Sequence, residues 1–383
     1  YAGGVGKDDR HQRHCRGAVI LAALCRRNGA FWVKAAQFFS CRPDVLPQEY
    51  IEAFQQLQND ASPVPFAKIE TALEKSWGKD WRDNFRWIDE NPVAVASIAQ
   101  VHRGRLKDGT DVAVKVRLPG VKKLFEQDAK VFQVLATLAA SRFREFDLKQ
   151  AVEQLLIMTA MELDFRNEAA NTRRFARQPH HPRIRIPELI DGLSGERILV
   201  TSWEEGPRLR NHLDAHPEQA GDLLSVLLTS YLQQVTRFGV YQADPHPGNF
   251  LVNAQGQVVI LDFGAIGVLT PDEVRRYSRL LYGLMGFEGD VDIGELFVQA
   301  GFKGGSPETL RELALYVLTD KVSQQGPVAA MGELMQRFRE ERISIPDSYI
   351  GISRVLITLG GFLMSYQVPF DWTPPEQRKA QST

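Results

Sequence analysis

Two short segments near the middle of the chain constrain its fold more than any other feature. The first, Gln242–Asn249, places Asp244 and Asn249 five positions apart, and the second, Leu261–Gly264, contains Asp262 followed by phenylalanine and glycine. Carboxylate and amide oxygens are the ligands that Mg²⁺ prefers in proteins. We therefore expect both segments to be loops that supply ligands to a metal-dependent site.

A lysine upstream completes this set. Lys115 lies in Val112–Val116, an alternating apolar segment rich in β-branched residues, which predicts a strand. The lysine and the two loops resemble, in order and spacing, the Val-Ala-Ile-Lys, Asp-x-x-x-x-Asn and Asp-Phe-Gly elements of protein-kinase-like phosphotransferases. Phosphoryl transfer requires mainly positioning and charge neutralisation. Lys115 would then bind the α/β-phosphates, Asn249 and Asp262 would bind Mg²⁺, and Asp244 would receive the proton of the acceptor.

Three further motifs resemble the UbiB family of atypical kinase-like proteins, also called the AarF or ADCK family. They are a Lys-x-Gly-Gln-like helix in Phe31–Phe38 followed by Arg42–Pro47, an Ala-rich loop in Val95–His102, and a Glu-x-Asp motif in Glu162–Asn171. One departure is Ala36, which stands where the family has glycine. It affects the packing of this helix more than the role of Lys34.

The resemblance also implies where a nucleotide, ATP or ADP, is held. The Ala-rich loop lies where protein kinases carry a glycine-rich loop over the phosphates. Because a Cβ restricts backbone approach and positive φ, we expect slow turnover or a preference for the diphosphate. The alternative is that these alanines only pack the end of a helix or strand. The implied contacts are Ala96, Ser97, Ile98, Ala99, Gln100, Lys115, Glu168 and the hinge residues Ser202 and Glu204.

The Glu-x-Asp motif supplies acidic partners for two lysines. A continuous helix would put Asp164 and Glu168 on one face, with Glu162 about 200° away. We expect Glu168 to pair with Lys115, and Glu162 with Asp164 to pair with Lys34. The opposite assignment, with Glu162 on Lys115, stays open. The resemblance groups Lys34, Gln37, Glu162 and Asp164 as regulatory residues.

The predicted fold class is α+β, a two-lobed protein-kinase-like fold with an N-terminal helical extension and a mainly helical C-lobe. The extension covers residues 1–60, the N-lobe 61–205 and the C-lobe 206–383. Helices are predicted over 67–77, 121–140 and 148–177, and Thr270–Glu273 is a helix start with a capping box. Only a few residues separate Asp262 from that start, so the long segment on which a protein kinase docks peptides is missing. This favours a small-molecule or lipid acceptor, or water.

Composition and charge limit the classes of partner and the cellular compartment that we expect. The 383 residues carry a formal net charge of −1, which gives no indication of nucleic acid. The cysteines, Cys15, Cys25 and Cys41, lack metal-site spacing and indicate a reducing, cytoplasmic compartment. No secretory signal is expected, and the apolar stretch 350–368 is interpreted as a buried C-lobe helix. The basic residues between Lys7 and Arg27 form either a solvated face or a contact with an anionic membrane surface, the latter giving a peripheral place on the inner membrane.

These patterns together predict an atypical kinase that binds ATP or ADP with Mg²⁺ and hydrolyses or transfers the γ-phosphoryl slowly. As the family resemblance implies, it would support ubiquinone or isoprenoid-quinone biosynthesis or lipid homeostasis, with a lipid or quinone precursor as partner and a homodimer as one oligomeric state. One alternative is a nucleotide-gated binding scaffold without chemistry. A second is a protein serine/threonine kinase.

Overall fold

The chain divides into two compact units that are described separately. The computed structural model describes residues 5–40, 48–55, 57, 63–140, 148–284, 291–315, 334, 337–338 and 340–368. Unit 1 contains Tyr1–Ala169 and Leu189–Trp203, and unit 2 contains Ala170–Glu188 and Glu204–Thr383. One division falls between Trp203 and Glu204, where the sequence predicts the hinge. Residues 170–188, expected in the N-lobe, group with unit 2.

Unit 1 is built on a five-stranded antiparallel sheet with the order β1-β3-β4-β6, in which β2 also pairs with β3. In β4, Val112, Val114 and Val116 are buried while Lys115 lies on the opposite face, because successive side chains of a strand alternate. The strands are β1 (Phe85–Ile88), β2 (Ala94–Val95), β3 (Ala99–Leu106), β4 (Asp111–Arg117) and β6 (Ile198–Ser202).

The valine face of this sheet is covered by α4 (Phe66–Trp77), which begins one residue before the predicted helix. Ile69 and Leu73 of α4 pack in one core with the β4 valines and with Val200 of β6. Burial of such side chains contributes about 1.5–3 kcal/mol each relative to exposure. The opposite face, which carries Lys115, is thereby held in a fixed orientation.

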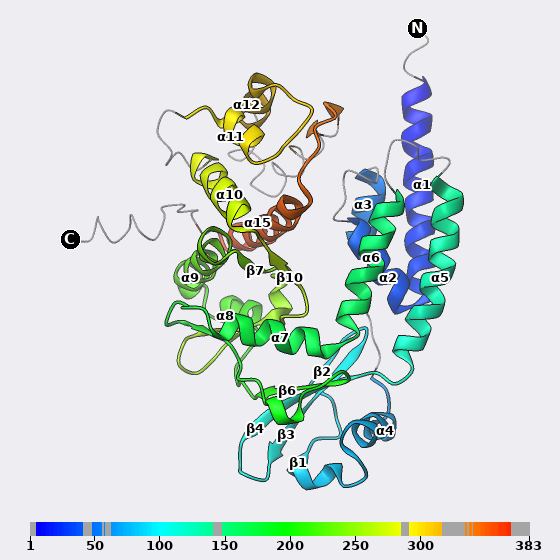
Figure 1. Ribbon diagram of the computed structural model, residues 1–383, viewed down its shortest axis with the longest axis vertical. Coiled ribbons are helices and arrows are strands. Elements are labelled where there is room, and N and C mark those ends of the chain that lie inside the picture. The colour runs from blue at the N-terminus through cyan, green and yellow to red at the C-terminus, as the bar shows by residue number, and fades with distance from the viewer. Residues whose placement is uncertain are drawn as a thin grey trace, which may run out of the picture. The chain divides into compact units, whose positions relative to one another are not determined.

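A second core of unit 1 joins the N-terminal helices to the helices that follow β4 (Figure 1). It contains Phe39 of α2, Phe54 of α3 and Leu155 of α6, with Phe132 of α5 packed against it. Gly29, with φ 99°, allows the chain to turn between α1 and α2. The helices are α1 (Val5–Asn28), α2 (Ala30–Ser40), α3 (Gln48–Gln55), α5 (Val121–Ala140) and α6 (Leu148–Glu162).

The expected continuous helix over 148–177 is wrong, because the chain breaks between α6 and α7 (Phe165–Ala176). Asp164 lies at the break and its Oδ1 accepts a hydrogen bond from the Arg166 backbone N–H at 3.1 Å. Aspartate favours this local bond over the interior of a helix. The helical i,i+4 relation expected between Asp164 and Glu168 therefore does not exist.

Unit 2 is mainly helical and carries two small sheets, β10-β7 and β5-β9-β8. Its helices surround one large core, in which Tyr231, Phe250 and Phe263 are almost completely buried. The remaining strands are β5 (Ile184–Arg185), β7 (Val240–Gln242), β8 (Phe250–Val252), β9 (Val258–Ile260) and β10 (Ile266–Val268). The helices are α8 (Leu209–Ala215), α9 (Ala220–Gln233), α10 (Pro271–Leu284), α11 (Ile293–Gln299), α12 (Pro307–Leu315) and α15 (Asp347–Ser365).

Within the described ranges, α15 is the single helix long and apolar enough to cross a bilayer by length and composition. Ile352, Leu359 and Phe362 of this helix are buried in the core of unit 2. A core helix passes the same test of length and composition. The structure therefore agrees with the interpretation of this stretch as a buried helix.

Candidate functional site

The lysine on β4 pairs with a glutamate on α7, and both belong to unit 1. Lys115 Nζ donates to both carboxylate oxygens of Glu168, at 2.7 and 2.8 Å. Glu168 is only 5% exposed. Lys115 Nζ also lies 5.4 Å from the centroid of the Phe165 ring. The expected pairing is confirmed, and the alternative that put Glu162 on Lys115 is wrong.

The lysine of the Lys-x-Gly-Gln-like helix has a different partner. Lys34 on α2 forms an ion pair with Glu162 at the end of α6, and both side chains are about four-fifths buried. Asp164, which was expected to share Lys34, binds the Arg166 guanidinium instead, at 2.9 and 2.5 Å. This contact lowers the pKa of the Asp164 carboxyl, since the positive charge stabilises the ionised form. Glu162 and Asp164, two positions apart, therefore bind different cations.

Gln37 and Ala36 show how the same helix is anchored. Gln37 Nε2 donates to the carbonyl of Leu57 at 3.2 Å, which ties α2 to the chain that follows α3. Ala36 is 2% exposed and packs in the core shared with Phe39. A methyl group is thus accommodated where the family motif has glycine.

The Ala-rich loop is the turn between β2 and β3. The Ala96 N–H donates to the Ala99 carbonyl at 2.8 Å, and Val101 of β3 pairs directly with Lys115 of β4. Ile98 and Ala99 are buried in one core with Phe31 of α2. Ala96 is exposed, so it is Ala96 and the half-buried Ser97 that the turn presents to solvent.

Gln100 requires a correction. Its side chain is completely buried, its Oε1 accepts from the Val64 N–H at 2.5 Å, and its Nε2 donates to the Val64 carbonyl at 3.3 Å. Both ends of the amide are therefore used to hold the segment before α4. The structure gives this side chain a structural role in place of the expected nucleotide contact.

The two expected hinge residues lie on either side of the division between the units. Ser202 ends β6 and pairs with Val112 in unit 1. Glu204 begins a segment of unit 2, where its carboxylate is bound by Arg185 Nε at 3.2 Å. Adenine contacts through the backbone at these positions stay a prediction.

In unit 2 the catalytic-type loop runs from β7 to β8. Asp244 is exposed, and Asn249 Nδ2 donates to the Asp244 carbonyl at 3.1 Å, closing the loop on itself. His246 Nδ1 accepts from the Gly248 N–H at 3.1 Å, so this histidine fixes the loop backbone. Because the amino group of the Asn249 side chain makes the bond to the Asp244 carbonyl, the side-chain carbonyl oxygen, on the other side of the amide, can serve as a metal ligand.

The Asp-Phe-Gly segment follows β9, next to the same loop. The Leu261 N–H donates to the Asn249 carbonyl at 2.9 Å, so the hairpin of β8 and β9 brings the two ligand-bearing segments side by side. Asp262 Oδ1 accepts from the Gly264 N–H at 2.7 Å. Phe263 is buried against Phe175 of α7, with ring centroids 4.8 Å apart. Local bonds and this aromatic anchor therefore orient the Asp262 carboxylate.

The donor set of this hairpin fits Mg²⁺ in the manner of a kinase. Among the described residues there is no cluster of three histidine, cysteine or acidic side chains that could enclose a metal by itself. Mg²⁺ keeps several waters and uses one or two protein ligands together with substrate phosphates. One carboxylate, from Asp262, and one amide oxygen, from Asn249, match that requirement.

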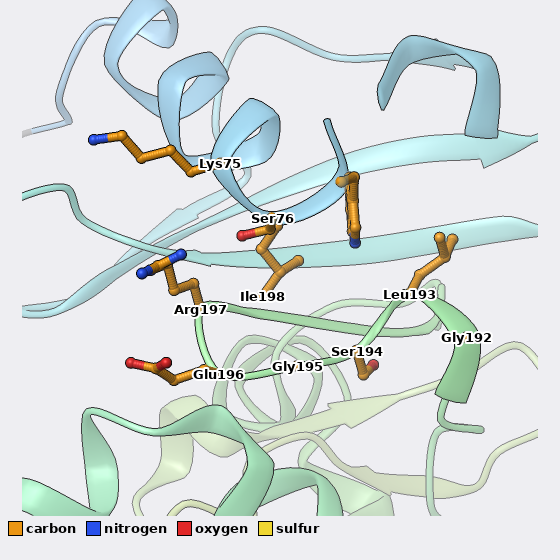
Figure 2. A pocket seen from close by; sticks show the side chains of 10 residues that line it. Lys75, Ser76, Gly192, Leu193, Ser194, Gly195, Glu196, Arg197 and Ile198 are labelled. Carbon is orange, nitrogen blue, oxygen red and sulfur yellow. The ribbon is translucent and has the colours of Figure 1, made fainter. Parts of the chain in front are cut away.

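A pocket of about 320 Å³ lies in unit 1 (Figure 2). It is bounded by the last turn of α4 and by the segment Gly192–Ile198. Figure 2 shows the Lys75, Glu196 and Arg197 side chains extending to one side of it. Glu196 is bound by Arg117 and Lys122, each at 3.3 Å. None of the expected site residues lines this pocket.

Sequence reasoning missed several residues that hold the loops. Asn171 on α7 donates to the Phe263 carbonyl at 2.8 Å, and Arg354 on α15 donates to the Ala243 carbonyl at 2.5 Å. Gln242 contacts both loops from β7. Gln242 and Asn171 lie inside the motifs Gln242–Asn249 and Glu162–Asn171, so these motifs could have indicated that both residues belong to the site. Arg354 lies more than a hundred residues from the loop that it contacts, and no local pattern marks it.

Comparison with known proteins agrees with this geometry. A model of the ABC1 atypical kinase-like domain matches residues 56–291. An uncharacterized protein of Synechocystis sp. is 30% identical over 283 residues, which cover 70% of this chain and 69% of that protein. AarF domain-containing protein kinase 1 of Mus musculus is 29% identical over 72% of this chain and 54% of its own length. The chloroplastic protein ACTIVITY OF BC1 COMPLEX KINASE 8 of Arabidopsis thaliana is 31% identical over 83% of this chain and 43% of its own length.

The chain therefore spans about half the length of the named relatives that it matches. A solved structure of the Rv3197–erythromycin complex from Mycobacterium tuberculosis aligns with 96% of this chain and 95% of its own chain, with a TM-score of 0.63 and 25% identity. The matched family model covers more than half of the sequence and includes both ligand-bearing loops and Lys115. The chain belongs to the ABC1 family of atypical kinase-like proteins, the UbiB, AarF or ADCK family.

Proposed function

We propose that this chain binds ATP or ADP with Mg²⁺ and slowly hydrolyses the nucleotide or transfers its γ-phosphoryl to a small-molecule or lipid acceptor. The observation that carries the proposal is the bidentate bond between Lys115 and the buried Glu168. A lysine held by a glutamate in this way is the phosphate-binding cation of kinase-like enzymes. Asn249 and Asp262 supply the metal ligands in unit 2.

Each residue has one part in the proposed reaction. Asp244 accepts the proton of the attacking hydroxyl or water, whose oxygen bonds to the γ-phosphorus while the bond from that phosphorus to the β-phosphate oxygen breaks and ADP leaves. Lys115 neutralises charge on the α/β-phosphates. Asn249 and Asp262 would hold Mg²⁺, which neutralises charge on the phosphates. Ala96 and Ser97, at the exposed part of the Ala-rich turn, are the proposed phosphate contacts of the loop, with Ser202 and Glu204 near adenine.

The segment after Asp262 supports a small acceptor. β10 begins four residues after Asp262 and pairs with β7, and α10 follows directly. The Thr270 N–H and hydroxyl donate to the Glu273 carboxylate at 2.8 and 2.9 Å, and the Glu273 N–H donates back to the hydroxyl at 3.2 Å. This capping box fixes the start of α10 and leaves no long segment for docking a peptide. A protein serine/threonine kinase is therefore the least supported alternative.

The proposed cellular role is based on the family resemblance, and the proposed membrane association is based on the exposed residues of α1. As in the family resemblance, we propose a role in isoprenoid-quinone biosynthesis or lipid homeostasis. Val19, Ile20 and Leu24 of α1 are exposed, and the flanking residues Arg16 and Arg26 are exposed as well. An apolar face flanked by cations fits the surface of an anionic membrane. We propose peripheral membrane association on this basis.

The experiment that tests the proposal is nucleotide turnover by the purified chain. ADP and inorganic phosphate would be measured with and without Mg²⁺, with and without anionic liposomes, and with quinone-precursor mimics. We expect slow Mg²⁺-dependent turnover that liposomes or precursor mimics increase. Absence of both turnover and Mg²⁺-dependent nucleotide binding would contradict the proposal.

A nucleotide-gated binding scaffold is the second candidate function. The similar Mycobacterium tuberculosis protein has been solved as a complex with erythromycin. The alanines of the phosphate loop also favour binding over fast chemistry, because a Cβ restricts the approach of the backbone to phosphate oxygens. Ala94 belongs to strand β2, and Ala99 is buried in strand β3. This candidate predicts ligand affinity that changes with ATP or ADP in the absence of any phosphate release.

Asp244→Asn should lower turnover while nucleotide affinity stays within a few-fold of wild type. The side chain is exposed, and its proposed partner is the acceptor rather than the phosphate-bound metal. Removing a general base typically costs about 10²–10⁴-fold in rate. Single-turnover kinetics and nucleotide titrations on the same preparation would separate the two effects. Equal losses of binding and turnover would remove Asp244 from the proposed role.

Lys34→Met should loosen α2 from α6 and change the preference between ATP and ADP. The variant leaves the Glu162 carboxylate without this cation in a partly buried place. We expect a loss of about 1–2 kcal/mol in the free energy of unfolding, between the values for exposed and buried pairs. Thermal unfolding and the ratio of ATP to ADP affinity are the measurements. Arg275→Met, which removes an exposed pair with Asp272, is the control, and an unchanged affinity ratio in Lys34→Met would exclude a regulatory role.

A further inference from the structure

Gln242, at the end of β7, contacts both loops of the proposed site with one side chain. Its Nε2 donates to the Asp244 carbonyl at 2.7 Å and to the Asp262 carbonyl at 3.3 Å. Its Oε1 accepts from the Asp244 N–H at 3.1 Å and from the Tyr231 hydroxyl at 2.7 Å. A glutamine amide has two donor hydrogens and two acceptor lone pairs, so every position is used.

The surroundings of Gln242 hold this amide in one orientation. Gln242 is 1% exposed, and its backbone N–H donates to Gln234 Oε1 at 3.0 Å. Gln234 is completely buried and its Nε2 donates to Ser230 Oγ at 3.3 Å. Gln234 opens the five-residue π-helix Gln234–Phe238, which directly follows α9. Such π-helical turns are rare and occur frequently at functional sites.

A buried polar network of this kind is costly unless every group is paired. Apolar residues would fill the same space without that requirement, so the amides are not explained by packing alone. The described contacts connect the chain at Ser230 to the loop of Asp244 and to the loop of Asp262, which lies twenty positions after Gln242. The two donor hydrogens of one planar amide let Gln242 bind both carbonyls at once without burying a charge.

We propose that Gln242 is a positioning residue that fixes the Asp244 loop relative to the Asp262 metal ligand. The inference rests on the proposed function, because it assigns the two loops to one reaction. A proton acceptor and a metal ligand must be held in a fixed relation for phosphoryl transfer, and displacement by about 1 Å can cost about 100-fold in rate. Gln242 does not contact nucleotide or metal in this proposal and acts through the two backbone carbonyls.

The test compares three variants with the wild-type chain. Gln242→Met fills a similar volume but donates no hydrogen bond, and Gln242→His keeps one ring N–H donor. Gln299→Met, an exposed glutamine on α11, is the matched control. We expect Gln242→Met to lower kcat about 100-fold and to raise the Mg²⁺ concentration needed for half-maximal rate. Nucleotide affinity without Mg²⁺ should stay within a few-fold, Gln242→His should recover part of kcat, and Gln299→Met should match wild type.

Hydrogen exchange on the nucleotide-free protein supplies a measurement that does not depend on activity. Gln242→Met should increase exchange in both loops, residues 243–249 and 261–265, and leave the helices of unit 2 unchanged. A wild-type chain without turnover would overturn the proposed function, and the exchange result would still decide the positioning role. Exchange and Mg²⁺ dependence that match wild type in Gln242→Met, or increased exchange throughout unit 2, would overturn the inference.

Discussion

Asp262→Asn is expected to abolish Mg²⁺-dependent nucleotide binding. The carboxylate is the only acidic group in the proposed ligand pair, since Asn249 contributes a neutral amide oxygen. The local structure should survive the substitution, because an asparagine Oδ1 can also accept the Gly264 N–H, which lies 2.7 Å from Asp262 Oδ1, and because the Phe263 ring stays buried. The variant therefore removes the negative ligand while the hairpin stays folded.

The measurement is the thermal shift given by ATP or ADP with and without Mg²⁺. A ligand at 100 times its Kd stabilises a protein by about 2.7 kcal/mol, so loss of binding is easily detected. Asp80→Asn is the matched control, because Asp80 is exposed and its side chain caps no helix. Asn249→Ala should weaken the Mg²⁺-dependent shift by less. An undiminished shift in Asp262→Asn would show that the metal ligand has been assigned wrongly.

The parts of the fold that the sequence predicts well are those specified by local patterns. The alternation of Val112, Val114 and Val116 defines β4 and places Lys115 on the other face. The capping box at Thr270 defines the start of α10. Both signals lie within a few residues, and tertiary contacts do not override them.

The parts that the sequence predicts poorly depend on contacts between distant residues. A continuous helix through Asp164 has acceptable local propensity, and the break depends on Phe165, which packs in a core with Leu199 and whose N–H donates to the Glu196 carbonyl. The role of Gln100 depends on Val64, 36 positions earlier. The partner of Ala243 is on α15, near the end of the chain. No pattern in a single sequence specifies these three contacts.

Local patterns identify the two lysines of unit 1, but distant contacts decide their partners. Motif order alone identifies Lys115 and Lys34, but the Glu-x-Asp segment contains three acidic residues and spacing permits more than one pairing. Bidentate geometry on Glu168 is possible only because β4 pairs with β6 and α7 starts beside that strand, where the Phe165 N–H donates to the Glu196 carbonyl at 3.0 Å. Sheet topology therefore decides which glutamate meets which lysine.

Lys115→Met is expected to remove nucleotide binding and also to destabilise unit 1. The substitution leaves the Glu168 carboxylate, 5% exposed, without its cation. Removing one partner of a buried pair costs about 3 kcal/mol or more, whereas replacing both partners with apolar residues is often neutral. The double variant Lys115→Met/Glu168→Leu should therefore regain most of the lost stability without regaining affinity for ATP or ADP.

Thermal unfolding and nucleotide titration of both variants separate the structural role of the pair from the proposed chemical role. Lys122→Met is the control, because its ammonium lies 3.3 Å from Glu196 at an exposed position and its removal should cost less than about 1 kcal/mol. A double variant that binds nucleotide as tightly as wild type would mean that Lys115 serves only to neutralise Glu168. A double variant that is stable and fails to bind would instead support the phosphates as the second partner of Lys115. The bidentate hydrogen bonds to Glu168 would then hold the Lys115 ammonium in position for the phosphates. This role would offset the cost of burying the two charges.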